Sequence, residues 1–144
     1  TQTLVHEAME GYRSMDDQRG IALGRIMQGR LELAVGRATE ATRSFREAAR
    51  ILEELSDWRS AAGARAFEAL ALETDGLFEE AEPLLEAQLL DIPRLALAEE
   101  CIASAFDKLC GLINHRRPDL AMQLDQVAEE TWQRLGRPAR VVRA

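Results

Sequence analysis

Apolar side chains recur every three or four positions along most of the chain, the spacing that places them on one face of an α-helix. Stripes of one kind lie within residues 5–15, 41–55, 81–92 and 121–135. Stripes of a second kind alternate with them, within residues 22–33, 62–69 and 102–113. The pattern predicts an all-α fold of about seven helices, near residues 2–15, 17–35, 38–55, 57–75, 78–91, 94–114 and 118–135.

Residues that begin helices stand between these stripes. Asp16 or Asp17, and likewise Ser56 or Asp57, can accept hydrogen bonds from the free N–H groups at the start of the following helix. These side chains therefore predict that one helix begins near position 17 and another near position 57.

Glycines and prolines mark the other helix ends. Gly36, Gly76 and Gly136 stand where a helix ends, a position that favours a positive φ and therefore glycine. Pro93 and Pro118 suit the first turn of a helix, because the N–H that proline lacks has no partner there. The two prolines predict that the last two helices begin beside them.

Similar residues also recur at intervals of forty positions, which indicates an internal repeat of one helix pair. Four columns carry the period: Gly36 and Gly76; Ala41, Ala81 and Ala121; Met15, Leu55, Leu95 and Leu135; and Tyr12, Leu52, Ile92 and Trp132. A smaller column joins Ala8, Ala48 and Ala128, with Gln88 as its exception.

The first of these turns resembles the tetratricopeptide repeat family. Gly36 stands in the turn, Ala41 follows five positions later, Phe45 four further and Ala48 three further, and residues 76–85 are similar to a version with proline after the acidic turn. Small alanines let two helices approach closely, and a large apolar residue one turn on fills the gap. The resemblance implies a right-handed superhelix of antiparallel helix pairs, a tetratricopeptide-like α-solenoid of the long-repeat type found in large bacterial regulators.

The resemblance covers nearly the whole chain and divides it into units. It implies a single repeat domain over residues 1–144. The units are a half-repeat at 1–16, repeats at about 17–56, 57–93 and 94–136, and an arginine-rich tail at 137–144. Because the first unit is incomplete, we expect the chain to be a section of a longer array.

Length and charge narrow the possible partners. A chain of 144 residues suits one domain, and 25 acidic against 18 basic residues argue against direct binding of nucleic acid phosphates. No stretch reaches the ~18 apolar residues of a membrane span, and no signal pattern begins the chain. We expect a soluble, cytoplasmic protein with no membrane contact. Its cysteines, Cys101 and Cys110, would then be reduced and largely buried, on opposite faces of one helix.

Charged residues are unevenly distributed. Residues 73–107 hold ten acids and one base, whereas the last twelve residues hold four arginines and no acid. We interpret the acidic segment as a solvated helix face and the basic end as a linker.

Residues that could carry catalysis are few. His6 and Glu7 are similar to the start of a zinc-protease helix, but the second histidine one turn later is missing. His115 lies where a helix C-terminus favours a cation, so we interpret it as a cap. Without a catalytic triad or a glycine-rich phosphate loop, we predict no enzyme, no cofactor and no metal site. Trp58 and Trp132 are expected in or beside the core, with ligand stacking as the alternative.

The inner face of such a superhelix is lined by the first helix of each pair, so that residues forty apart lie side by side. One polar column reads Gln28, Glu68 and Lys108, and its neighbour holds Arg25 and Arg65. Two arginines on adjacent helices could hold a carboxylate or a peptide C-terminus through bidentate hydrogen bonds. These five residues are the candidate partner-binding site; the alternative is that they form a solvated helix face.

These observations predict a non-catalytic protein–protein interaction module that binds a protein or peptide, as the scaffolding or sensory part of a multidomain bacterial regulator. Two alternatives remain. Exposed solenoid ends could join two copies in a homodimer, because such ends leave apolar area uncovered. A small-molecule sensor would instead need a closed apolar pocket near Phe106, Cys110 and Ile113.

Overall fold

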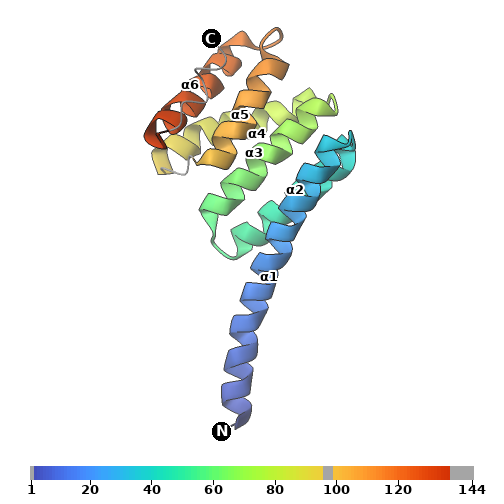
Figure 1. The fold of residues 1–144 in the computed structure, drawn as a ribbon, viewed down its shortest axis with the longest axis vertical. Coiled ribbons are helices and arrows are strands. Elements are labelled where there is room, and N and C mark those ends of the chain that lie inside the picture. The colour runs from blue at the N-terminus through green and yellow to red at the C-terminus, as the bar shows by residue number, and fades with distance from the viewer. Residues whose placement is uncertain (1, 96–98, 137–144) are drawn as a thin grey trace.

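The computed structural model describes residues 2–95 and 99–136, and in these two ranges it contains six α-helices and no strand (Figure 1). The all-α prediction is therefore confirmed for the described part of the chain. The helices are α1 (Gln2–Ala34), α2 (Ala38–Glu54), α3 (Trp58–Thr74), α4 (Phe78–Leu95), α5 (Glu100–Ile113) and α6 (Pro118–Arg134).

The prediction of about seven helices was wrong at the first boundary. A single helix of 33 residues, α1, runs through Asp16 and Asp17, where we expected one helix to end and another to begin. A capping aspartate starts a helix only if the chain before it leaves the helical conformation, and residues 10–19 contain no proline that would force it to do so. The first half of α1 consequently projects away from the other helices (Figure 1).

The expected start of the sixth helix, near residue 94, was also wrong. Pro93 lies inside α4, which continues to Leu95, and α5 begins only at Glu100. A proline near the end of a helix removes one backbone hydrogen bond, and α4 ends two residues after it. Pro118 does occupy the first turn of α6, as predicted.

Turns with positive φ separate several of the helices. Gly36, Gly76 and Gly136 have φ values of 84°, 79° and 69°, which confirms the predicted helix ends. Between α2 and α3, Ser56 adopts the same left-handed conformation with φ of 58°. Asp57 then caps α3, since its Oδ1 accepts a hydrogen bond from the backbone N–H of Ser60 at 3.3 Å.

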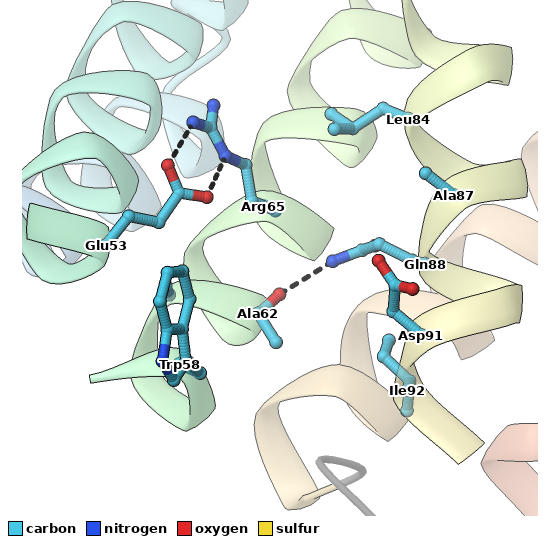
Figure 2. Close-up of a pocket in the computed structure, with 10 residues that line it drawn as sticks. Glu53, Trp58, Ala62, Arg65, Leu84, Ala87, Gln88, Asp91 and Ile92 are labelled. Atoms are coloured by element: carbon cyan, nitrogen blue, oxygen red, sulfur yellow. Dashed lines mark hydrogen bonds and ion pairs between the residues drawn. The ribbon is translucent and has the colours of Figure 1, made fainter. Parts of the chain in front are cut away.

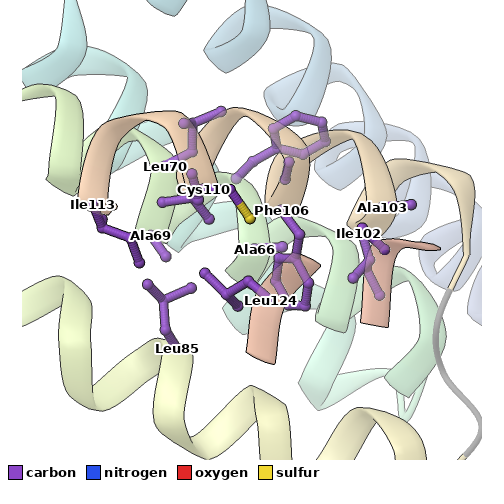
Figure 3. Close-up of a cluster of buried hydrophobic side chains, with 14 of the residues drawn as sticks. Ala66, Ala69, Leu70, Leu85, Ile102, Ala103, Phe106, Cys110, Ile113 and Leu124 are labelled. Atoms are coloured by element: carbon purple, nitrogen blue, oxygen red, sulfur yellow. The ribbon is translucent and has the colours of Figure 1, made fainter. Parts of the chain in front are cut away.

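All consecutive helices except α4 and α5 pack as neighbours, and α3 lies at the centre of the molecule. It packs against α2, α4 and α5, and α5 packs in turn against α6. Most of α3 is therefore buried, and its side chains join those of α4, α5 and α6 in the main apolar cluster (Figure 3). The adjacent helix pairs are the coarse arrangement that the alternating stripes predict.

Close approach of α1 and α2 depends on one glycine. A Cβ atom placed on Gly29 would lie 2.8 Å from Cε1 of Phe45, well inside contact distance. Phe45 is fully buried, and its ring stacks on Phe67 of α3 at 5.3 Å between ring centroids. The first three helices are thus joined through this aromatic pair.

Candidate functional site

An open cleft of about 790 Å³ is lined by side chains of α1, α3 and α5. These are the first helices of successive pairs, the elements that the sequence pattern places on the inner face. The lining residues are Met27, Arg30, Leu31, Leu33, Ala34, Phe67, Leu70, Thr74, Lys108, Gly111 and Leu112. This set is called the cleft below.

The cleft combines exposed apolar side chains with positive charge. Met27 and Leu31 are 59% and 67% exposed, although side chains of this kind are usually buried. The lining residues include two cations, Arg30 and Lys108, and no acid. The Arg30 guanidinium lies over the ring of Phe67, 5.2 Å from its centroid. The cleft therefore offers an apolar surface with a cationic edge.

The predicted arginine pair does not form an open carboxylate site. The Arg25 guanidinium donates a hydrogen bond to Gln28 Oε1 at 3.0 Å and lies 3.4 Å from the Glu47 carboxylate. Arg65 makes a bidentate pair with Glu53, with N–O distances of 3.1 and 2.8 Å (Figure 2). Each arginine thus already holds a carboxylate of α2.

A second acid, the buried Glu68, also accepts a hydrogen bond from Arg65. Its side chain is 5% exposed and accepts hydrogen bonds from Arg65 at 2.7 Å and from Arg46 at 2.9 Å. Hydrogen bonding to Glu53, the largest effect, and to Glu68 raises the pKa of Arg65 above its ordinary value, although partial burial acts in the opposite direction. Of the five candidates, only Lys108 lines the cleft.

A second charged cluster, not predicted from the sequence, joins α4 to the turn before α6. The Glu73 side chain is 1% exposed and accepts a hydrogen bond from Arg116 at 2.9 Å. Arg116 also donates to Glu82 at 3.2 Å, and its guanidinium lies 3.8 Å from the centroid of the Phe78 ring. These contacts, led by the bond to Glu73, raise the pKa of Arg116.

The acidic segment is therefore not simply a solvated face. Arg117 extends the cluster, donating to Glu82 at 3.1 Å and lying 3.6 Å from Glu86. The sequence signal was present, because Arg116 occupies the place where two earlier turns have glycine, but the spacing alone does not show which acids it reaches.

The two tryptophans have different surroundings. Trp132 is nearly buried, as expected, and its indole N–H donates to Asp107 Oδ2 at 2.7 Å. Trp58, which was expected in or beside the core, is not buried and has 56% of its surface exposed. It lies at the edge of a smaller cavity beside α3 and α4 (Figure 2).

The closed pocket that a small-molecule sensor would need near Phe106, Cys110 and Ile113 is not found there, because these side chains pack in the core. All three are buried members of the main apolar cluster, and none lines either cavity (Figure 3). Neither cysteine forms a disulfide; Cys110 is buried as expected and its thiol donates to the Ala121 carbonyl at 3.2 Å, whereas Cys101 is exposed. Cys101 begins α5 on the opposite face, away from this cluster.

Comparison with models of protein families, with curated proteins and with solved structures finds no significant match. No described helix is both long and apolar enough to span a bilayer. Over the same residues, no group of three or more His, Cys, Asp or Glu side chains is placed to hold a metal ion.

Proposed function

We propose that this chain is a non-catalytic protein–protein interaction module of the tetratricopeptide-like superhelical type, which binds a segment of a protein partner in the cleft. The observation that carries the proposal is the set of exposed apolar side chains on the cleft, led by Met27 and Leu31. In a larger bacterial regulator, such a module would serve as a scaffold or a sensor.

The side chains that line the cleft indicate what kind of partner segment can bind there. Burying one Met or Leu side chain contributes about 1.5–3 kcal/mol, so a few apolar anchors suffice for measurable affinity. Arg30 and Lys108 are the two charged residues of the cleft, and both are cationic. They favour a segment that carries an acidic residue beside its apolar anchors.

A peptide selection tests this proposal. Peptides are selected from an unbiased display library against the intact chain, and their affinities are measured by fluorescence anisotropy. We expect the double variant Met27→Glu, Leu31→Glu to bind the selected peptides at least tenfold more weakly, because it places charge among the apolar anchors. The matched control is Met122→Glu, which changes an exposed methionine of α6 outside the cleft. If both variants bind like the unmodified chain, the cleft is not the binding site.

Self-association is a second candidate, supported by an exposed apolar stripe along α1 that shares Met27 and Leu31 with the cleft. Leu23 and Val35 are exposed, and with Met27 and Leu31 they form a stripe at intervals of four residues. This stripe lies opposite the residues that pack on α2, such as Ala22 and Gly29. A second copy could cover it and form a homodimer.

Sedimentation equilibrium distinguishes the two candidates. Leu23→Glu with Val35→Glu should dissociate a dimer formed through the stripe and leave peptide affinity unchanged, because neither residue lines the cleft. A chain that stays monomeric at high concentration would exclude the homodimer.

A further inference from the structure

The smaller cavity, of about 260 Å³, is formed by one side of α3 and one side of α4, with Glu53 of α2 at its edge (Figure 2). Its apolar walls include Ala62, Leu84 and Ile92. None of its residues belongs to the cleft, so it is a separate feature of the surface.

The cavity occurs where the alanine column is interrupted. Ala48 and Ala128 are fully buried in the second helices of their pairs, and Gln88 occupies the corresponding position of α4. The longer Gln88 side chain reaches α3, where its Nε2 donates to the Ala62 carbonyl at 2.8 Å (Figure 2). An alanine at this position would allow closer helix packing. Gln88 therefore bridges α4 and α3 at the place where the cavity lies.

Gln88 also leaves one hydrogen-bond acceptor unused. The residue is only 7% exposed, and its Oε1 has no partner among the residues that the structure describes. A buried amide oxygen without a partner is unfavourable, and such groups in folded proteins usually mark a bound molecule or a functional role. A donor N–H or O–H that entered the cavity beside Gln88 would satisfy this oxygen.

Trp58 supplies an aromatic surface at the edge of the same cavity. It belongs to the first turn of α3 and remains more than half exposed. A ring placed on the indole would gain stacking in addition to apolar burial against Leu84 and Ile92. The cavity thus offers a flat aromatic contact, apolar walls and one acceptor.

Charge further restricts what can bind. Glu53 and Asp91 are the acids of the lining, and Arg65 is its one base. Arg65 is already paired with Glu53 and Glu68, so it is not a free anchor for an anion. With two acids and one base, the lining has a negative formal charge, which favours a neutral or cationic ligand over an anion.

We propose that this cavity binds a neutral or cationic aromatic group that bears an N–H or O–H donor. The ring stacks on Trp58, and the donor forms a hydrogen bond with Gln88 Oε1. Cavities of about 150 Å³ already accept benzene, so a bicyclic ring the size of indole fits this one. The group could belong to a free small molecule or to a tryptophan side chain of a partner, and the experiment separates these sources.

Binding is measured by NMR titration of the 15N-labelled chain with indole. We expect the indole N–H signal of Trp58 to shift, whereas that of Trp132 stays in place because it is held by Asp107. Indene has the same shape without the N–H donor and should bind about five- to tenfold more weakly. Tryptamine should bind at least as well as indole, and indole-3-acetate more weakly. An unchanged Trp58 signal at millimolar indole would overturn the proposal.

Two variants separate the roles of the residues. Gln88→Ala places alanine where the forty-residue column otherwise has it. This variant should bind indole and indene with equal affinity. Trp58→Ala changes an exposed side chain, so the chain remains folded, and both probes should lose about tenfold or more in affinity. Met122→Ala is the control outside the cavity. If Gln88→Ala still prefers indole over indene, Gln88 is not the acceptor and the proposal fails.

A blocked pentapeptide, Gly-Gly-Trp-Gly-Gly, identifies the source of the ring. If it shifts the Trp58 signal as strongly as indole, the proposed ligand is a partner's side chain; if only free indole does so, it is a small molecule. Either result supports an aromatic donor site, whereas a lack of response to both contradicts it.

Discussion

Replacement of Arg116 by alanine tests how the acidic segment is held in place. The substitution leaves the Glu73 carboxylate, which is 1% exposed, without the Arg116 Nη2 group that donates to both of its oxygens. Removing one partner of a buried ion pair costs about 3–5 kcal/mol, because the remaining charge is desolvated and uncompensated. Loss of the cation–π contact with Phe78 adds about 0.5–1 kcal/mol. We expect the free energy of unfolding to fall by at least 3 kcal/mol.

Urea unfolding followed by circular dichroism measures this loss, and Arg117→Ala is the matched control. Arg117 pairs with Glu86 and Asp119, which are more than half exposed, and with Glu82, which keeps its bond from Arg116. Its removal should therefore cost clearly less than the removal of Arg116. A double variant that also replaces Glu73 with leucine should recover most of the loss, because no buried charge remains. Equal effects of Arg116→Ala and Arg117→Ala would refute the reasoning.

Three other predictions concern local geometry and pH. Gly29→Ala should destabilise the chain by about 1–3 kcal/mol, because the added Cβ meets the Phe45 ring on α2. Gly24→Ala meets no neighbouring atom and should stabilise the chain by about 0.5–1 kcal/mol. Thermal unfolding measures both effects. Ser56→Gly should raise the melting temperature, because a positive φ is strained in serine. Hydrogen bonding from Arg117 lowers the pKa of Asp119 below its ordinary value of 3.8. The stabilisation by the Asp119 carboxylate is therefore present above this value and is lost as the pH falls through the lower folded-state pKa. Asp119→Asn should be less stable than the unmodified chain at pH 7, and this difference should shrink as the pH is lowered below 3.8.

The helix pattern was predictable because apolar spacing and turn glycines are local signals. Gly36 and Gly76 end the helix directly before them, and this effect depends only on neighbouring residues in the sequence. Continuation of α1 through Asp16 was not predictable in this way, because an aspartate is compatible with both a cap and a helix interior.

The candidate site was harder to predict because it depends on which side chains meet in space. Arg65 was correctly placed on the first helix of a pair, but its occupation by Glu53 and Glu68 depends on how α2 and α3 pack. The cleft did leave a signal in the sequence. Met27 and Leu31 are apolar positions outside the stripe that packs on α2, and such a second apolar face indicates another contact surface.

The central claim is that the cleft holds a partner segment, and methyl NMR of the chain with a display-selected peptide tests it most directly. We expect the methyl signals of Met27, Leu31 and Leu112 to shift on binding, while that of Met122 on α6 stays unchanged. Shifts confined to α6, with the three cleft methyl signals unchanged, would contradict the account.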